Sequence, residues 1–273
     1  MLDIIYSLFF GAIQGITEFF PISSSGHLVL FHEVVPLTLG DSLAFDVALH
    51  VGTLGALVLV FRKEITLYSI AFFRSFSKWN VREDVNQRIS WFLVLATIPS
   101  IIVGLLANDI IESLFRNTLL VAILLIGVGL LFFPIEKLSR KNRSIKNLTF
   151  KDALWIGLAQ VLAFMPGVSR SGITLLVGFG RDLTREAAAR FSFLLAIPIV
   201  FIAGAKKVYD LTQVSITSSE LISLAIGFVA SLLVGFAVIK YFLRFVRNHS
   251  LIPFAWYRIA LGAAVIVLLI LNL

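Results

Sequence analysis

The chain has 273 residues, of which 59% are hydrophobic and only 14% are charged, and its mean hydropathy is +0.97. Soluble domains carry about 25% charged and about 45–50% apolar residues, so this composition excludes a soluble globular enzyme, a disordered chain and a nucleic-acid-binding module. The net charge of +7 fits basic loops on the cytoplasmic side of a membrane, and the lack of cysteine excludes disulfide frameworks and thiolate metal sites.

The apolar segments follow one another in two similar series. Residues 4–35 form a long apolar run, a Pro/Ser/Gly break at 21–26 and a shorter run. Three segments of about the length that crosses a bilayer follow at residues 43–61, 89–107 and 119–134. Residues 153–179 repeat the broken pattern around 166–172, and three more spans follow at residues 191–205, 221–239 and 254–273.

Irregular backbone at membrane depth is tolerated only inside protein or beside a water-filled cavity. We therefore predict an all-α polytopic membrane protein with six transmembrane helices and two re-entrant helix–loop–helix elements. Because no polar linker is long enough to separate two domains, we expect residues 1–273 to form a single membrane-embedded domain.

The basic residues test this layout. Most of them lie in four connecting segments, residues 62–88, 137–151, 181–190 and 240–247. If these segments are cytoplasmic, the other loops keep only Arg116, Lys206 and Lys207. Making either re-entrant element a single span would turn half of the basic loops outward. We therefore expect a multi-pass protein of the inner (plasma) membrane with both termini outside and an active site that opens to the outer face.

The two halves, approximately residues 1–135 and 150–273, resemble each other at an offset of 146 positions. The matching pairs are Gly11 and Gly157, Gln14 and Gln160, Ser23 and Ser169, Ser25 and Ser171, Gly26 and Gly172, and Phe45 and Phe191. Each half holds three spans, an odd number, so the second half is upside down relative to the first. An inverted-topology repeat of this kind places two broken helices tip to tip near the midplane, where binding sites form.

The first broken element carries a carboxylate at membrane depth. Gly11, Gln14, Gly15 and Glu18 fall at helical spacing on one face, and the two glycines fit close helix packing. A buried, unpaired Glu18 would protonate or need a cation. A Lys or Arg partner would meet that need, and so would a divalent metal ion such as Mg²⁺ or Ca²⁺.

The break that follows reads Ser23, Ser24, Ser25, Gly26 and His27. Three hydroxyls and a glycine at the start of a short helix predict an anion cradle, because backbone N–H groups and the positive end of the helix dipole meet there. A helix N-cap is the simpler interpretation, but it needs only one serine. His27 is either a core histidine with satisfied hydrogen bonds or a general base, nucleophile or proton donor.

The second break supplies Ser169, Arg170, Ser171 and Gly172. An arginine at membrane depth is costly without an anion, and its planar fork suits bidentate phosphate binding. The alternative is an ion pair with an acidic residue of the first half, namely Glu18, Asp46 or Glu33. Asp46 and His50 lie four residues apart in the first span, and we interpret them as candidates for supporting the site. The whole set fits a phosphate or pyrophosphate group on an amphiphilic substrate, with a divalent metal.

Two motifs carry a family resemblance. Residues 14–27, Gln-Gly-Ile-Thr-Glu-Phe-Phe-Pro-Ile-Ser-Ser-Ser-Gly-His, resemble the first signature of the undecaprenyl-pyrophosphate phosphatases of the bacitracin-resistance type. Residues 166–172, Pro-Gly-Val-Ser-Arg-Ser-Gly, resemble the second, and the likeness covers essentially the whole chain. The resemblance implies hydrolysis of a polyprenyl pyrophosphate lipid to the monophosphate and phosphate, a divalent metal and a role in recycling the carrier lipid of cell-wall (peptidoglycan) synthesis.

The resemblance also implies residue roles. Glu18 matches the glutamate that binds metal or pyrophosphate, Ser24 and His27 match the residues of the displacement, and Arg170 matches the phosphate clamp. The remaining predicted substrate-binding residues are Gln14, Ser23, Ser25, Gly26, Ser169, Ser171 and Gly172. Gln14 stands where the family has Glu or Gln, and because an amide is a weak ligand for a hard metal we assign it a hydrogen-bonding role. Ser25 stands where many members have Thr.

Several alternatives stay open. Ser24 as nucleophile with His27 as its base is our preferred interpretation, and direct attack by His27 is the other. A secondary transporter or flippase of polyprenyl phosphate competes with the phosphatase, but it needs only the clamp and no nucleophile. A structural scaffold would leave the buried arginine and glutamate unexplained. We expect the lipid and the bilayer as partners, and a homodimer stays an open alternative.

Overall fold

The computed structural model describes residues 2–34, 42–106, 117–211 and 217–271. Within these ranges every secondary-structure element is a helix, which confirms the predicted all-α class. The α-helices are α1 Leu2–Thr17, α2 Ser24–Val34, α3 Ser42–Ser75, α4 Val85–Leu106, α6 Thr118–Leu138, α7 Phe150–Val161, α8 Arg170–Gly180, α9 Arg185–Leu211, α10 Ser218–Asn248 and α11 Ile252–Ile270. Short 3₁₀ turns lie at Ile145–Asn147 and Leu162–Phe164.

Six of these helices, α3, α4, α6, α9, α10 and α11, are long and apolar enough to cross a membrane. They correspond one to one to the six predicted spans, so the number and order of spans are confirmed for the described residues. The predicted ends were wrong for three of them: α3 continues to Ser75, α9 already begins at Arg185, and α10 continues to Asn248. Lys, Arg and Glu are good helix formers whose long side chains reach water, so a charge does not end a helix.

The predicted end of the first span is nevertheless visible in α3. Phe61 has a φ of −98° and a ψ of 16°, outside helical values, and the helix kinks there. Its ring packs edge-on against Phe193 of α9 at 6.3 Å, and Phe193 also contacts Phe19 and Phe242 at 5.5 and 5.7 Å. This aromatic cluster joins the kink, α9, α10 and the residue after Glu18, so the core lies directly beside the first break.

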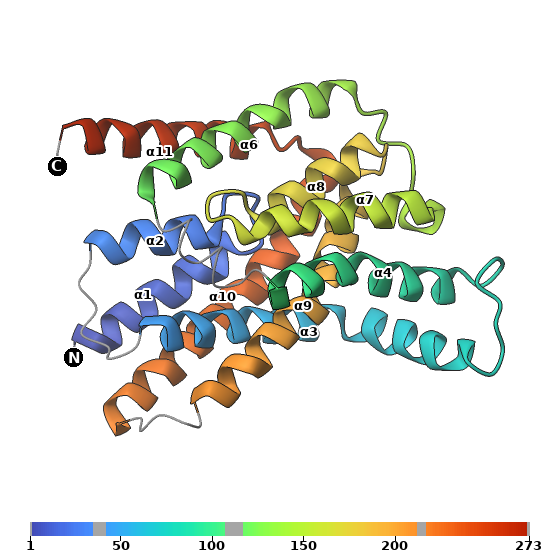
Figure 1. Cartoon of the computed structure of the whole chain (residues 1–273), viewed down its shortest axis with the longest axis horizontal. Coiled ribbons are helices and arrows are strands. Elements are labelled where there is room, and N and C mark those ends of the chain that lie inside the picture. Colours follow the sequence, from blue (N-terminus) through green and yellow to red (C-terminus); the bar gives the residue numbers. More distant parts are fainter. Residues whose placement is uncertain (1, 35–41, 107–116, 212–216, 272–273) are drawn as a thin grey trace.

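Both broken elements form two helices with a turn between them. The turns are residues 18–23, here called the first serine turn, and residues 165–169, the second serine turn. Figure 1 shows that α1 and α2, and likewise α7 and α8, double back so that both turns lie near the middle of the molecule. The helices α2 and α8 have 11 residues each, which at 1.5 Å per residue is about 16 Å and only half of a hydrocarbon core of about 30 Å.

Glycines set the positions of the first helices of these elements. A Cβ added to Gly11 of α1 would lie 2.6 Å from Cβ of Ala230 in α10, and one added to Gly15 would lie 2.9 Å from the backbone N of Gly235. The interpretation of these glycines as packing residues is therefore confirmed. In α7, a Cβ on Gly157 would lie 2.5 Å from the carbonyl oxygen of α4 residue Ala96. The two helices that lead into the turns are thus held by contact with the backbone of α10 and α4.

We expect Gly157→Ala to destabilise the protein by about 1–3 kcal/mol, the usual cost of overpacking, because its methyl group would meet backbone atoms that cannot yield. Thermal unfolding of the purified protein in detergent measures the effect. Gly127→Ala in α6 is the matched control, since its Cβ has no atom within 4 Å. Equal unfolding temperatures for Gly157→Ala and the unchanged protein would show that the crossing of α4 and α7 is looser than described.

A buried carboxylate fixes the first turn of α7, at the end away from the second serine turn. Asp152 is fully inaccessible and accepts hydrogen bonds from Arg143 and Arg181, at 2.5 Å and 2.7 Å, and from the Thr149 backbone. Burial by itself raises the pKa of Asp152, but the hydrogen bonds from both arginines and from Thr149 override it and hold the pKa at about 2. The ionised pairs therefore tie the segment before α7 to the end of α8.

Candidate active site

A cavity of about 350 Å³ lies beside both serine turns, between residues of α3, α4, α7 and α9. Its polar wall consists of Glu18, Ser24, Ser25, His50, Ser100, Gln160, Ser169 and Arg170. The rest of its wall is apolar and includes Phe164 and Val200. The cavity thus combines ionised groups, hydroxyls and an apolar surface, as a site for an amphiphilic substrate must.

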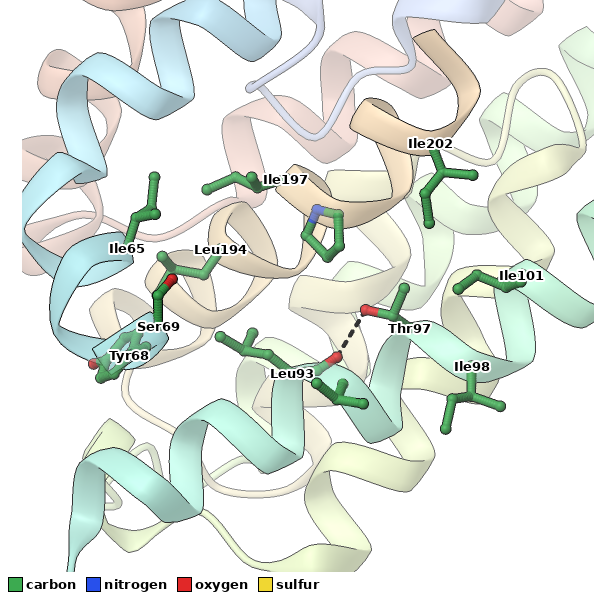
Figure 2. Close-up of a pocket in the computed structure, with 12 residues that line it drawn as sticks. Ile65, Tyr68, Ser69, Leu93, Thr97, Ile98, Ile101, Leu194, Ile197 and Ile202 are labelled. Carbon is green, nitrogen blue, oxygen red and sulfur yellow. Dashed lines mark hydrogen bonds between the residues drawn. The ribbon is translucent and has the colours of Figure 1, made fainter. Parts of the chain in front are cut away.

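A second cavity, of about 340 Å³, lies between α3, α4 and α9 and is shown in Figure 2. Its lining is apolar except for Tyr68, Ser69 and Thr97, and the hydroxyl of Thr97 donates to the Leu93 carbonyl of its own helix at 2.7 Å. Since no ionised group lines it, this cavity offers nothing to polarise a phosphate. The polar cavity is the candidate active site.

The two serine turns are built alike. Ser23 and Ser169 have φ values of 74° and 72°, the left-handed region that costs an L-residue about 1–2 kcal/mol. Each serine hydroxyl accepts a hydrogen bond from a glycine N–H three residues later, Gly26 at 3.2 Å and Gly172 at 3.1 Å. Ser23 therefore caps α2, as the simpler interpretation of the first break allowed, and Ser169 caps α8 in the same way. Ser24 remains on the cavity wall.

The turns also interlock. The N–H of Gly167 in the second turn donates to Oγ of Ser23 at 3.1 Å. In return, Oγ of Ser171 lies 3.3 Å from the Glu18 carbonyl and 3.1 Å from the Phe20 carbonyl of the first turn. Ser171 and Ser23 thus hold one turn against the other, whereas Ser169 also borders the cavity.

Arg258 of α11 is a residue that the sequence analysis missed. Its side chain is fully buried, and its guanidinium donates to the carbonyls of Pro21 at 3.1 Å, Gly167 at 2.7 Å and Val168 at 3.1 Å. It also donates to Leu125 of α6 at 3.2 Å. The N–H groups of one planar guanidinium thus fasten both serine turns to α6 and α11. An arginine inside the predicted span 254–273 was the signal that could have revealed it.

Glu18 is the centre of the site. It is buried, with 7% exposure, and its Oε1 accepts a hydrogen bond from Nη2 of Arg170 at 2.9 Å. Its Oε2 accepts from the Ser24 hydroxyl at 2.6 Å and from the Gln14 amide at 3.1 Å. The same amide of Gln14 contacts Nδ1 of His50 at 2.9 Å. Of the partners that the sequence left open for Arg170, the structure therefore selects Glu18.

His27 lies behind the first serine turn and not on the cavity wall. Its Nδ1 is 2.7 Å from the Ser23 carbonyl, which can only accept, so this nitrogen carries the proton. Its Nε2 is 2.7 Å from the hydroxyl of Tyr257, and the two rings stack at 5.7 Å. The structure therefore shows no contact of the kind expected for Ser24 as nucleophile with His27 as its base: both ring nitrogens of His27 have other partners, and the Ser24 hydroxyl donates to Glu18.

The sequence analysis had identified only one of three further residues on the cavity wall. His50 was singled out with Asp46 as a candidate support, and it lies 3.6 Å from Glu18. Gln160 and Ser100 were not assigned to the site, although both line the cavity. The match of Gln160 with Gln14 in the repeat could have indicated that Gln160 belongs to the site. Ser100 lies in an apolar helix, and no sequence motif marks it.

The sequence matches known proteins over nearly its whole length. Residues 7–264 match the family described as Bacitracin resistance protein BacA. A relative from Rubrobacter xylanophilus, named undecaprenyl-diphosphatase, is 41% identical over 272 residues, which is 99% of this chain and 100% of the relative. Undecaprenyl-diphosphatase 1 of Pseudoalteromonas translucida is 40% identical with the same coverage, and the undecaprenyl-diphosphatase of Methanosphaera stadtmanae is 39% identical over 98% of this chain and 99% of its own. The chain belongs to the Bacitracin resistance protein BacA family.

Proposed function

We propose that the chain is an integral membrane phosphatase that hydrolyses undecaprenyl diphosphate to undecaprenyl phosphate and phosphate, and so returns the carrier lipid to cell-wall synthesis. The observation that carries the proposal is the contact of Glu18 with both Ser24 and Arg170 on the wall of a cavity among apolar helices. The names of the relatives support the same substrate. A flippase needs a clamp for phosphate but no hydroxyl held against a carboxylate, so the geometry favours the enzyme.

In the proposed mechanism the terminal phosphate enters between the two serine turns. The guanidinium of Arg170 exchanges part of its contact with Glu18 for the phosphate oxygens, for which its fork is well suited. The first N–H groups of α2 and α8, and the hydroxyl of Ser25, supply further donors to the anion. These groups stabilise the charge that spreads over the transferring phosphoryl group.

We further propose that Ser24 attacks with Glu18 as its base. At 2.6 Å the carboxylate is within reach of the hydroxyl proton. The Ser24 oxygen bonds to the terminal phosphorus, the bond from that phosphorus to the bridging oxygen breaks, and the proton passes to Glu18. Undecaprenyl phosphate leaves, and a water molecule then hydrolyses the phosphoserine to release phosphate. His27, with Tyr257, positions the first serine turn from behind.

A divalent cation, Mg²⁺ or Ca²⁺, remains part of the proposal. Among the described residues no three His, Cys, Asp or Glu side chains form a metal cluster, and Glu18 is the one carboxylate on the cavity wall. Mg²⁺ is usually held by one or two carboxylates together with substrate phosphates and water, so this donor set fits an ion that arrives with the diphosphate. Glu18 would hold it, and it would neutralise charge on the phosphate oxygens.

Phosphate release from undecaprenyl diphosphate by the purified protein in detergent, with and without a chelator, tests the function. Transport needs a sealed bilayer, so release in detergent supports the enzyme. A protein that binds the lipid but releases no phosphate with either cation would instead support the flippase. Light scattering of the same sample tests the homodimer, which stays a prediction.

The clamp role of Arg170 has its own test. Lysine keeps the charge but loses the planar fork, so Arg170→Lys should release phosphate about 10- to 100-fold more slowly, the worth of a hydrogen bond to a charged group. Arg190→Lys is the matched control, since Arg190 also pairs with a glutamate, Glu64, but away from the cavity. If Arg170→Lys matched the unchanged enzyme, charge alone would explain the residue.

We also propose that the two broken elements are re-entrant and form an inverted-topology repeat, with both termini and the mouth of the active site on the outer side of the inner membrane. The like-built serine turns and the shortness of α2 and α8 support this. In addition, α1 crosses α10 at Gly11 as α7 crosses α4 at Gly157. The basic residues of the cytoplasmic segments support the orientation.

Cysteine labelling tests the orientation in a chain that has no cysteine of its own. Ser219→Cys, at the start of α10, should react with an impermeant thiol reagent in intact cells, and Ser77→Cys, after α3, should react only in broken cells. Both positions are exposed, so accessibility does not bias the comparison. The reverse labelling pattern would place the site on the cytoplasmic side.

A further inference from the structure

Two polar side chains of the cavity wall have no part in the mechanism above. Ser100 of α4 and Gln160 of α7 are 1% and 3% exposed, and Nε2 of Gln160 donates to Oγ of Ser100 at 3.1 Å. Oε1 of Gln160 has no hydrogen-bond partner among the described residues. Buried amide oxygens almost always have a partner, so an unpaired one in a residue that lines the cavity points to a ligand that changes its hydrogen bonding.

A half-turn of the Gln160 amide would satisfy the pair. Oε1 would then accept the hydroxyl proton of Ser100, and the two N–H groups of Gln160 would be free to donate to a ligand. The pair would thereby offer an anion two neutral donors while leaving no acceptor unpaired. What binds there must therefore carry acceptor oxygens, as a phosphate does.

A diphosphate has two phosphates, and the mechanism uses only the terminal one. Arg170, Glu18 and Ser24 engage the phosphate that is transferred, whereas the phosphate that stays on the lipid needs other donors. Ser100 and Gln160 line the same cavity, and apolar side chains such as Ile199 and Val200 also lie on its wall. Neutral donors suit this phosphate, because a second arginine would hold the charged product too tightly for release.

We propose that Ser100 and Gln160 form a subsite for the phosphate that stays on the lipid, and that this subsite makes the enzyme recognise a lipid diphosphate. The inference rests on the proposed function. In the sequence, Gln160 stands 146 positions after Gln14, whose amide serves Glu18. The two glutamines thus assist the two phosphates of one substrate.

The test compares Gln160→Leu and Ser100→Ala with Thr97→Val. Thr97 lies one turn before Ser100 on α4 and is equally buried, but its hydroxyl bonds its own helix and faces the other cavity. The inhibition constant of undecaprenyl monophosphate measures binding at the proposed subsite, and that of inorganic phosphate measures binding at the site around Arg170. For Gln160→Leu and Ser100→Ala we expect the inhibition constant of the monophosphate and the KM of the diphosphate to rise about 10-fold or more. The constant for inorganic phosphate, and all constants of Thr97→Val, should stay unchanged.

An unchanged inhibition constant for the monophosphate in both variants overturns the proposal, and so does a parallel loss of inhibition by inorganic phosphate. Should Gln160→Leu fail to fold, Ser100→Ala decides, because it removes a single oxygen. Should the unchanged protein release no phosphate, the proposed function fails separately. Calorimetric binding of undecaprenyl monophosphate in detergent then tests the subsite alone, and equal affinity of the variants and the unchanged protein would refute it.

Discussion

Replacing Glu18 by glutamine should abolish nearly all phosphate release while the protein stays folded. The carboxylate accepts hydrogen bonds from Arg170, Ser24 and Gln14. An amide of the same shape cannot take the proton of Ser24, forms no ion pair with a guanidinium, and is a poor ligand for a hard cation. The loss of a general base alone slows a reaction by roughly 10²- to 10⁴-fold, and here the other two roles are lost with it.

The measurement is steady-state phosphate release from undecaprenyl diphosphate, with thermal unfolding of the same preparation as a check of the fold. Glu64→Gln makes the same chemical change in a glutamate that pairs with Arg190 away from the cavity. We expect that variant to keep the rate of the unchanged enzyme. Near-normal release by Glu18→Gln would remove Glu18 from the centre of the mechanism.

The sequence predicted the architecture where a single physical pattern decides it. Hydropathy over about 20 residues located the six spans, and Pro, Ser and Gly marked both breaks. The ends of α3, α9 and α10 were not predictable in this way, because basic residues favour helix as much as apolar ones do. Several basic residues that we expected in loops therefore lie within α3, α9 and α10.

The site was predicted less completely, because its contacts join distant segments. Spacing along one helix placed Gln14 and Glu18 together, and the hydrogen bond between their side chains confirms that they are neighbours. It could not choose between Glu18, Asp46 and Glu33 for Arg170. Nor could it show that the hydroxyl of Tyr257, in another helix, forms a hydrogen bond with the imidazole of His27. A buried Arg258 escaped notice because a span is recognised by its average hydropathy, which a single charge hardly changes.

The contact between Ser24 and Glu18 leads to the prediction that separates the two nucleophiles. Loss of one hydrogen-bond donor to the transferring group costs roughly 10²- to 10³-fold at most. If Ser24 attacks, the rate of Ser24→Ala should fall by more than this, to the background rate. Ser25→Ala removes the neighbouring hydroxyl on the same cavity wall, and its rate should fall by no more than the loss expected for one hydrogen-bond donor.

Quenching the reaction and mapping the phosphorylated peptide identifies the attacking atom directly. We expect a phosphoserine at Ser24, whose hydroxyl is held 2.6 Å from Glu18. His27→Ala should also slow turnover, but through the first serine turn, because its Nδ1 holds the Ser23 carbonyl and its Nε2 is occupied by Tyr257. The KM should rise with that displacement, while phosphoserine still forms. A phosphohistidine at His27 would require the imidazole to leave both partners and turn to the cavity, and its detection would transfer the attack from Ser24 to His27.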